Sequence, residues 1–231
     1  MAVTPTECTG VAVADRLARV RERISAAGGS PDRVTVVAVT KGHGPEAATA
    51  AVAAGLTDVG ENYAAEAAAT GAALRAGPEA GVRLHFLGRV QRNKVRTLAG
   101  VVDLWQGVDR LAAGREIAKR SPGASVLVQL DVSGEATKNG CPPAEAPRLV
   151  EDLDAMGLDV RGLMAVGPTG PPEAARPGFA GLVAMAERLG LPERSIGMTD
   201  DLEVAVGEGA TMIRVGRALF GPRNGTDDLR R

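Results

Sequence analysis

The feature that most constrains this sequence is a regular alternation of short β-branched runs with longer, alanine-rich amphipathic stretches. In the long stretches apolar residues recur at the spacing of one helix face, while the short runs are largely apolar throughout. This alternation is typical of a parallel sheet, because parallel neighbours need a long, usually helical, crossover. Strands are predicted at residues 34–39, 57–60, 82–87, 101–106, 125–132, 160–166, 195–198 and 211–215.

The helices predicted between these strands complete eight strand–helix units, preceded by one additional helix. Eight units in about 200 residues fit a (β/α)8 barrel of the TIM type. The alternative is an open doubly wound sheet, but no G-x-G-x-x-G motif follows the first strand. No linker divides the chain, so residues 1–231 are predicted to form a single α/β barrel domain. Helical segments are predicted at residues 11–27, 45–54, 64–75, 92–99, 110–120, 144–155, 179–189, 201–207 and 217–220.

Composition narrows the classes of function. Lys plus Arg total 27 and Asp plus Glu total 28, so the net charge of −1 gives no broad electrostatic reason to bind nucleic acid or a membrane. Aromatic residues make up only 2%, which disfavours a platform for base stacking. No segment approaches the ~20 apolar residues of a membrane span, and the first residues lack a signal-peptide pattern. The sequence therefore predicts a cytoplasmic protein.

Cysteine and histidine are too scarce for a disulfide or metal framework. The chain has two cysteines, Cys8 and Cys141, and two histidines, His43 and His85. Neither cysteine lies in a cluster with metal-ligand spacing, so we expect no metal site. We interpret His85 as a hydrogen-bonded core histidine and Cys141 as an inert thiol.

Lys41 is the most informative single residue. In a barrel, functional residues follow the C-terminal ends of the strands, and Lys41 follows the first one. Removal from water lowers the pKa of an amine there, and a neutral lysine can form a Schiff base with an aldehyde. The alternative is a lysine that reaches out of the barrel rim or pairs with a carboxylate. On position alone, that plainer alternative is the commoner one.

A second feature is residues 214–221, where Gly216 separates the last strand from a short helix. Barrels often bind phosphate at this place, and a glycine lets backbone N–H groups approach the phosphate oxygens. A tight turn that closes the barrel would need the same glycine. Thr199 could add a hydroxyl, and Asn62 could hold a ring oxygen or cap the next helix. A Schiff-base lysine and a phosphate site across one barrel mouth together indicate pyridoxal 5′-phosphate (PLP).

Seven sequence blocks occur in a characteristic order. They are VAVTK at 37–41, GENY at 60–63, LHFLG at 84–88 with QRNK at 91–94, VSGE at 132–135 with KNG at 138–140, GLMAVGP at 162–168, GMTDDLE at 197–203 and RVGRALFG at 214–221. These blocks resemble the pyridoxal phosphate homeostasis protein family, whose fold is the barrel domain of alanine racemase without the second domain. Any one block is weakly specific, but seven in register are very specific, and they cover nearly the whole chain from about Val11 to Arg223.

The resemblance implies a role for each matching position. Lys41 would hold the cofactor as a Schiff base, and Arg214 would hydrogen-bond the pyridine nitrogen. An arginine opposite this nitrogen disfavours a pyridinium, which weakens the electron sink that many PLP enzymes use. That arrangement suits a carrier better than a fast catalyst. The remaining cofactor contacts would come from Asn62 along the ring and from Thr199, Gly216 and Arg217 around the phosphate.

The function implied by the resemblance is a binding protein without a catalytic residue of its own. It would bind PLP, limit the free reactive aldehyde and transfer the cofactor to apo-enzymes. One alternative is a PLP-dependent amino-acid racemase, but two-base racemisation needs an acid/base group on each face of the substrate. In related racemases a partner's additional domain supplies the second base. The chain ends soon after Phe220, so we expect no such domain and a monomer. A class I aldolase, in which the lysine attacks the substrate directly, is the other alternative.

Two loops depart from the family pattern. Lys41 is followed by Gly42, His43 and Gly44, which predicts a more flexible lysine loop with an additional histidine. The loop at residues 167–172 is unusually rich in proline. Neither change removes an assigned role, but both bear on substrate access and loop closure.

Overall fold

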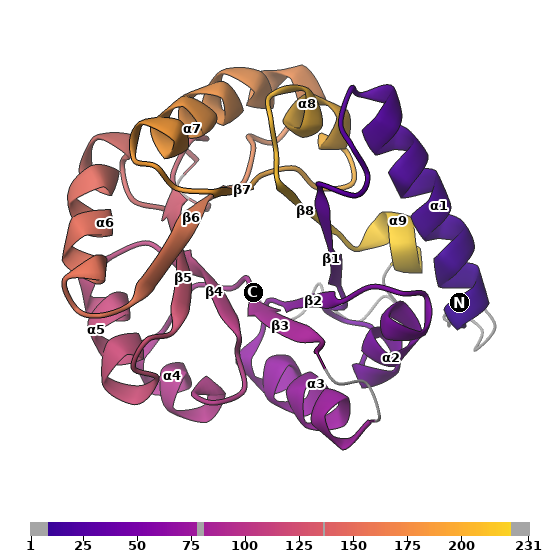
Figure 1. Cartoon of the computed structure of the whole chain (residues 1–231), viewed down its shortest axis with the longest axis horizontal. Coiled ribbons are helices and arrows are strands. Elements are labelled where there is room, and N and C mark those ends of the chain that lie inside the picture. The colour runs from indigo at the N-terminus through magenta and orange to yellow at the C-terminus, as the bar shows by residue number, and fades with distance from the viewer. Residues whose placement is uncertain (1–8, 78–80, 136, 223–231) are drawn as a thin grey trace.

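The computed structural model describes residues 9–77, 81–135 and 137–222, which form a closed barrel of parallel strands (Figure 1). Each strand pairs with the next along the chain, and β8 pairs with β1 to close the ring. All carboxyl ends therefore meet at one mouth, which confirms the predicted TIM-type barrel. The strands are β1 (Thr35–Val39), β2 (Asp58–Glu61), β3 (Arg83–Phe86), β4 (Leu104–Val108), β5 (Ser125–Leu130), β6 (Asp159–Ala165), β7 (Glu193–Ser195) and β8 (Met212–Val215).

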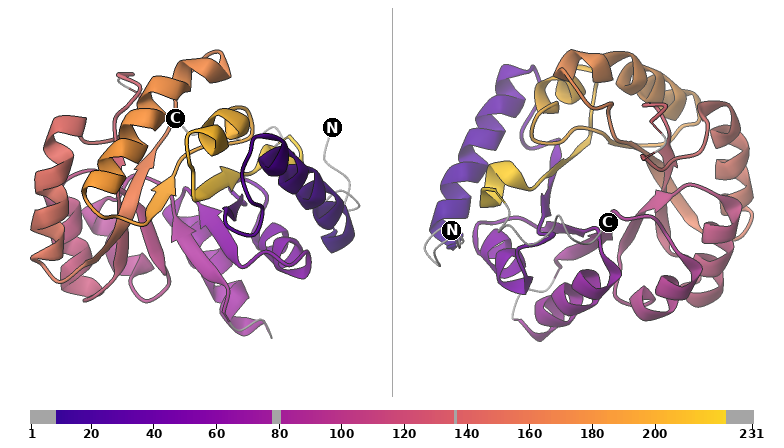
Figure 2. Two further views of the ribbon diagram at one scale, coloured as in Figure 1. Left: turned by 45° about the horizontal axis from the view of Figure 1, so that its top comes forward. Right: turned by 180° about the vertical axis from the view of Figure 1, so that it is seen from behind.

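Helices surround the barrel, one after each strand, and one more precedes β1 (Figures 1 and 2). The main apolar core lies between strands and helices and consists mostly of Val, Leu, Ile and Ala, as the low aromatic content requires. The helices are α1 (Gly10–Ala26), α2 (Pro45–Ala53), α3 (Ala64–Ala76), α4 (Arg92–Leu98), α5 (Leu111–Arg120), α6 (Ala146–Asp154), α7 (Arg176–Arg188), α8 (Leu202–Gly207) and α9 (Arg217–Phe220), with 3₁₀ turns η2 (Pro143–Glu145) and η3 (Pro172–Ala175).

The barrel interior is filled by side chains, because alternate residues of each strand point inward. Part of this space is taken by a cluster of buried apolar residues that we term the interior plug. Polar side chains lie inside the barrel as well, notably His85 and Gln106, and both are fully buried. The barrel is therefore a packed core and not a pore. The interior plug consists of Val37, Leu104, Leu127, Met164 and Met212.

The additional helix α1 braces the mouth where the barrel closes. It packs against α2, α8 and α9 (Figure 1). Arg16 Nη1 donates to the Leu219 carbonyl at 3.0 Å, and Arg23 Nη2 donates to the Thr199 carbonyl at 2.8 Å. Helix α1 thus holds the loop after β7 and the short helix after β8 in place.

Two strand predictions are wrong in position. The fourth strand starts at Leu104 and not at residue 101, because the N–H groups of Val101 and Val102 donate to the Leu98 carbonyl and end α4. Asp103 then accepts the Leu84 N–H at 2.7 Å before the strand begins. Val101 and Val102 have the β-branched side chains typical of a strand, yet their backbone N–H groups bond within the turn that ends α4.

The seventh strand spans Glu193–Ser195 and not residues 195–198. Gly197 has φ +94°, outside the extended region, so it ends the strand. The strand instead recruits Glu193 and Arg194, which pair with β6. Their polar side chains lie at the barrel end remote from the mouth, where a search for apolar runs does not find them.

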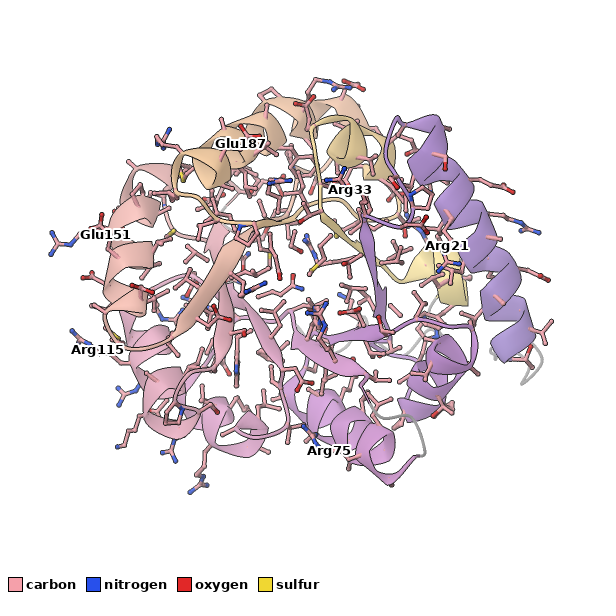
Figure 3. All side chains as sticks on the ribbon, in the orientation of Figure 1. Arg21, Arg33, Arg75, Arg115, Glu151 and Glu187 are labelled. Atoms are coloured by element: carbon pink, nitrogen blue, oxygen red, sulfur yellow. The ribbon has the colours of Figure 1, made fainter. Side chains whose placement is uncertain are left out.

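The outer surface is charged. Arg115 and Glu151 point away from the barrel into solvent (Figure 3), and Arg21 on α1 is exposed as well. Among the helices of the described ranges, none combines the length and the apolar character needed to cross a membrane. The start of the chain, judged above for a signal peptide, and Cys8 lie outside the described residues.

Candidate functional site

A cavity of about 430 Å³ lies at the barrel mouth among the loops that follow the strands. Small-molecule sites typically occupy about 300–1,000 Å³. All the residues predicted as cofactor contacts line it, so the fold brings together positions far apart in the sequence. These are Lys41, Asn62, Thr199, Arg214, Gly216 and Arg217; the other lining residues are Val39, His43, Leu87, Met164, Val166, Met198, Asp200, Gly221 and Pro222.

Lys41 reaches this cavity from a tight turn directly after β1. Thr40, one residue earlier, points to the outer side of the sheet, where its Oγ1 donates to Oε1 of the buried Glu61 at 2.6 Å. Because successive side chains of a strand alternate, Lys41 faces the barrel mouth. The His43 N–H closes the turn on the Thr40 carbonyl at 3.0 Å, and Gly42 takes φ +76°, where glycine is favoured.

The lysine loop contacts helices on both sides. The His43 ring packs against Phe220 of α9, with ring centroids 5.5 Å apart. The Gly42 N–H donates to Glu66 Oε2 of α3 at 3.3 Å. The loop that the sequence predicts to be more flexible therefore contacts α9 through His43 and α3 through Gly42.

Glu61 is a buried carboxyl behind this loop, at the end of β2, and is 1% exposed. Its Oε1 accepts hydrogen bonds from Thr40 at 2.6 Å and Thr70 at 2.7 Å, while Oε2 has no partner among the described residues. Burial raises the pKa of Glu61 to about 7; the threonine hydrogen bonds oppose this rise, and the nearby Glu66 carboxyl adds to it. A group next to the Lys41 turn therefore changes charge near neutral pH.

We expect the ionisation of Glu61 to change the free energy of unfolding between about pH 4.5 and 8. Because the pKa of Glu61 is raised from 4.5 to about 7 on folding, the neutral carboxyl stabilises the fold at low pH. That contribution is lost as the pH rises through 7. Relative to the parent protein, a Glu61→Gln variant should gain about 3 kcal/mol of unfolding free energy over this range. Urea unfolding, followed by fluorescence of the buried Trp105, measures the gain.

The matched control is Glu151→Gln, at an exposed carboxylate on α6 (Figure 3). Its unfolding free energy should follow the parent protein at every pH. A constant offset for Glu61→Gln, without any change between pH 4.5 and 8, would contradict the raised pKa.

The turn between β8 and α9 forms another part of the cavity wall. Gly216 has φ −113°, so its backbone angle alone does not require glycine. The requirement comes from close approach: a Cβ at this position would lie 3.0 Å from the Val39 carbonyl oxygen. Thr199 Oγ1 accepts the Ala218 N–H at 3.4 Å. Thr199 and the Gly216 turn therefore lie side by side, as a shared phosphate contact requires.

Arg217 lies at the same end of the cavity, but its guanidinium pairs with Asp200. The two side chains are 57% and 74% exposed. An exposed pair of this kind contributes only about 0–1 kcal/mol, so an incoming phosphate could compete for Arg217. The sequence analysis predicted Arg217 at the site but not its acidic partner.

Arg214 is the deeply buried charge of the cavity wall, with 5% exposure. Its Nη1 donates to the carbonyl and the hydroxyl of Ser195 at 2.7 and 2.8 Å, and its Nη2 donates to the Ala165 carbonyl at 2.8 Å. Burial lowers the pKa of Arg214 to about 10, and the charge of Asp201 opposes this. Since none of these hydrogen-bond acceptors is a carboxylate, the cavity offers a cation to an electron-rich ligand.

Asn62 lines the cavity and does not cap α3. The N-cap residue of that helix is Tyr63, and no side chain caps it. Of the two interpretations left open for Asn62, the capping one is therefore excluded. Beside Asn62, the apolar side chains of Leu87, Met164 and Val166 supply the kind of surface against which a ring packs.

His85 and Cys141 agree with the sequence analysis. His85 is fully buried, with Nε2 2.9 Å from Asp58 Oδ1 and Nδ1 2.7 Å from Gln106 Nε2, as expected of a hydrogen-bonded core histidine. Cys141 is 4% exposed, and burial raises the pKa of its thiol to about 11. A thiol of this kind is not reactive at neutral pH.

The sequence analysis missed three polar residues that the structure connects to the cavity wall, namely Glu61, Gln106 and Ser195. Glu61 borders the Lys41 turn, and Ser195 contacts Arg214 and Gln106. Each is a polar residue in or next to a predicted strand whose neighbours are mostly apolar. That contrast was the available signal.

A larger and more open hollow of about 710 Å³ lies between α4 and α5. It contains none of the predicted site residues. Its walls are mostly long charged side chains, and Arg120 pairs there with Glu116. The mouth cavity, which combines apolar walls with buried polar groups, is the better candidate for a small-molecule site.

Comparison with known proteins first defines the class. A family model described as alanine racemase, N-terminal domain, matches residues 11–224. The match covers most of the chain and includes every residue of the cavity. The protein is thus a barrel of the alanine racemase N-terminal domain class.

Similar curated proteins then define the family. A pyridoxal phosphate homeostasis protein from Pseudomonas aeruginosa is 41% identical over 220 residues, covering 92% of this chain and 94% of the relative. The protein of the same name from Escherichia coli K12 is 34% identical over 92% of this chain and 97% of its own. The chain belongs to the pyridoxal phosphate homeostasis protein family.

Solved structures agree with this assignment. PipY of Synechococcus elongatus, with PLP bound, is 32% identical and superposes with a TM-score of 0.74, covering 90% of this chain and all (100%) of PipY. Without PLP, the same protein gives a TM-score of 0.79. The resemblance on which the sequence analysis relied is confirmed.

Proposed function

We propose that this protein binds PLP in the mouth cavity, held as a Schiff base on Lys41, and serves cofactor homeostasis as a non-catalytic carrier. The observation that supports this most directly is the convergence of Lys41, the buried Arg214 and the Gly216 turn on one cavity. An aldehyde, a pyridine nitrogen and a phosphate need three contacts of these kinds. The PLP bound in PipY, a member of the same structural class, supports the same cofactor.

The residues of the wall fit this cofactor. When bound, PLP supplies an aldehyde that condenses with an amine and releases water. Lys41 offers the amine from the turn after β1, and Arg214 offers N–H donors that match an unprotonated ring nitrogen. Thr199 and Gly216, side by side, leave room for phosphate oxygens near backbone N–H groups. Asn62 lines the ring.

A carrier is favoured over a racemase by what surrounds Lys41. Two-base racemisation needs proton-transferring groups on opposite faces of the substrate. Among the described cavity residues, His43 and Asp200 also carry groups that can transfer a proton, but His43 comes from the same loop as Lys41 and Asp200 is paired with Arg217. Arg214, a donor without acceptor capacity, also disfavours the pyridinium that stabilises carbanions. The proposal includes a cytoplasmic monomer whose further partners are apo-enzymes that use PLP.

Two measurements on the PLP-loaded protein test the proposal. In D₂O with alanine or serine, proton NMR should show negligible exchange of the α-proton. With the loaded protein as the sole source of PLP, an apo-transaminase should regain activity. A Lys41→Met protein, taken through the same loading and desalting, is the control for free cofactor carried over.

The outcomes separate the candidate functions. Rapid α-deuteration with many turnovers would favour the racemase and overturn the carrier. Failure to reactivate the transaminase, with PLP still bound, would remove delivery from the proposal and leave buffering. A protein that is colourless after loading with PLP and desalting would sink both.

A further inference from the structure

A line of buried polar side chains crosses the barrel interior beneath the cavity. From β2 to β8 it consists of Asp58, His85, Gln106, Ser195 and Arg214, which we term the interior chain. Consecutive members lie 2.7 to 2.9 Å apart. All five are buried, with exposures from 0% to 5%. Of the five, Arg214 is the member that lines the cavity.

The direction of each hydrogen bond follows from the chemistry of the groups. A guanidinium has donors only, so Ser195 Oγ must accept from Arg214 Nη1. The single hydroxyl proton of Ser195 is then donated to Gln106 Oε1 at 2.7 Å. This orients the Gln106 amide, because its other end must carry the N–H groups. Those groups reach His85 Nδ1 at 2.7 Å and the sulfur of Met212 at 3.1 Å.

The far end of the interior chain is anchored by a carboxylate. Since Gln106 donates to Nδ1 of His85, a neutral ring has its proton on Nε2, which donates to Asp58 Oδ1 at 2.9 Å. Burial alone would raise the pKa of Asp58, but the hydrogen bonds from His85 and Thr57 outweigh it and lower the pKa. Arg83, which is 46% exposed, pairs with the same carboxylate at 2.7 Å. Every donor between Arg214 and Asp58 therefore points toward Asp58.

This arrangement fixes the guanidinium of Arg214. Both Nη1 protons are used by Ser195, and one Nη2 proton is used by the Ala165 carbonyl. Two N–H groups, one on Nη2 and one on Nε, remain outside these bonds among the described residues. The plane of a guanidinium held at two nitrogens cannot rotate without breaking at least one of these bonds.

Filling space does not explain the interior chain. The neighbouring interior plug occupies the same barrel with apolar side chains alone. Buried polar groups stabilise a fold less than apolar ones of similar size, unless all of them are hydrogen-bonded. Here four side chains without access to the cavity form a fully connected path that ends at the one member facing it. That geometry points to a role in orienting Arg214.

We propose that Asp58, His85, Gln106 and Ser195 are positioning residues that hold Arg214 with its remaining N–H donors toward the ring nitrogen of PLP. This inference rests on the proposed function. In this proposal the four residues determine the hydrogen bond to the ring nitrogen of PLP, although none of them touches that nitrogen. Disturbing them should therefore alter the ring nitrogen and not merely the stability of the barrel.

The experiment compares two buried glutamines. Gln106→Met removes both amide hydrogen bonds of the interior chain at similar side-chain volume. Gln129→Met is the matched control, because Gln129 is also buried, lies on the adjacent strand β5 and bonds the Asn139 carbonyl outside the chain. Each protein is loaded with PLP that carries ¹⁵N in the ring, and its ¹⁵N chemical shift, PLP dissociation rate and melting temperature are measured. Ser195→Ala and the hydroxyl-retaining Ser195→Thr provide a second pair.

Gln106→Met and Ser195→Ala should move the ring ¹⁵N signal and raise the PLP dissociation rate about tenfold, as expected for one misaligned hydrogen bond to a charged group. Gln129→Met should leave both at parent values, whatever its melting temperature, and Ser195→Thr should restore the parent signal relative to Ser195→Ala. If Gln106→Met does not fold, the serine pair decides.

Other outcomes overturn the inference. A parent-like ¹⁵N signal in both Gln106→Met and Ser195→Ala would show that the interior chain is structural only. An equal shift in Gln129→Met would trace the effect to general loosening of the barrel. If neither the parent protein nor Gln129→Met binds PLP, the proposed function itself is overturned. That result differs clearly from bound PLP with an unchanged ¹⁵N signal, which would contradict only the role of the interior chain.

Discussion

A Lys41→Met variant should show no protein-bound pyridoxyl group after borohydride reduction, whereas the parent protein should contain one per chain. The reason is chemical: borohydride converts an imine into a stable secondary amine, so the label stays on the lysine that formed it. The Lys41 side chain lines the mouth cavity from the turn closed by His43 and Thr40. Peptide mass mapping of the reduced protein locates the label.

The chain offers its own internal controls, because it contains only three other lysines, Lys94, Lys119 and Lys138. Lys119 on α5 is exposed, and Lys119→Met should retain the full label on Lys41. Lys138 is held by Glu135 at 3.0 Å and by the Gly167 carbonyl at 2.7 Å, so its amine is already engaged. A label confined to one of these three lysines would sink the assignment of Lys41.

Gly216→Val should weaken PLP binding by roughly tenfold to a hundredfold, and Gly216→Ala by less. Any Cβ at this position meets the Val39 carbonyl oxygen at 3.0 Å, so the turn must shift or the side chain must enter the space beside Thr199. Losing one hydrogen bond to a charged phosphate costs about 1.5–3 kcal/mol, and 1.4 kcal/mol is a factor of ten in affinity. Titration of PLP absorbance measures the loss.

The control for this pair lies on α7. A Cβ at Gly181 would meet nothing within 4 Å, so Gly181→Ala should leave PLP affinity unchanged. Because Gly216 also lies where β8 meets β1, melting temperatures of all three variants must accompany the titrations. A folded Gly216→Val protein with parent affinity would contradict a phosphate at this turn.

The barrel could be predicted because its signal is local. The apolar strand at residues 34–39 and the helix that begins with a proline after it can each be recognised from their own residues. Eight such strand–helix units then fit few arrangements other than a closed barrel. The errors fell where hydrogen-bond partners outside the apolar run decide, in one case within a local turn and in the other on a neighbouring strand. Val101 and Val102 look like strand residues, yet their N–H groups end α4, and Glu193 looks like a loop residue, yet it pairs with β6.

The candidate site divides in the same way. Lys41 and Gly216 could be found from position, since each lies within two residues of the end of a predicted strand, while the part assigned to Arg214 came from the resemblance. Arg217 was predicted to face a phosphate, but its pairing with Asp200 depends on how two loops meet. The surroundings of Glu61 depend likewise on a threonine from another helix. Sequence shows which residues reach the mouth, but not which neighbours they meet there.

The interior plug has a consequence for how cofactor moves. Side chains such as Leu127 and Met212 fill the barrel below the cavity, so among the described residues the cavity is reached from the mouth side. PLP, water and any amine that approaches Lys41 would therefore pass the same loops at the barrel mouth. A molecule that enters the cavity would therefore obstruct one that leaves it. If PLP is held as an imine on Lys41, the bulkier of two equally nucleophilic amines should therefore release it more slowly, because the amine has to pass these loops to reach the lysine.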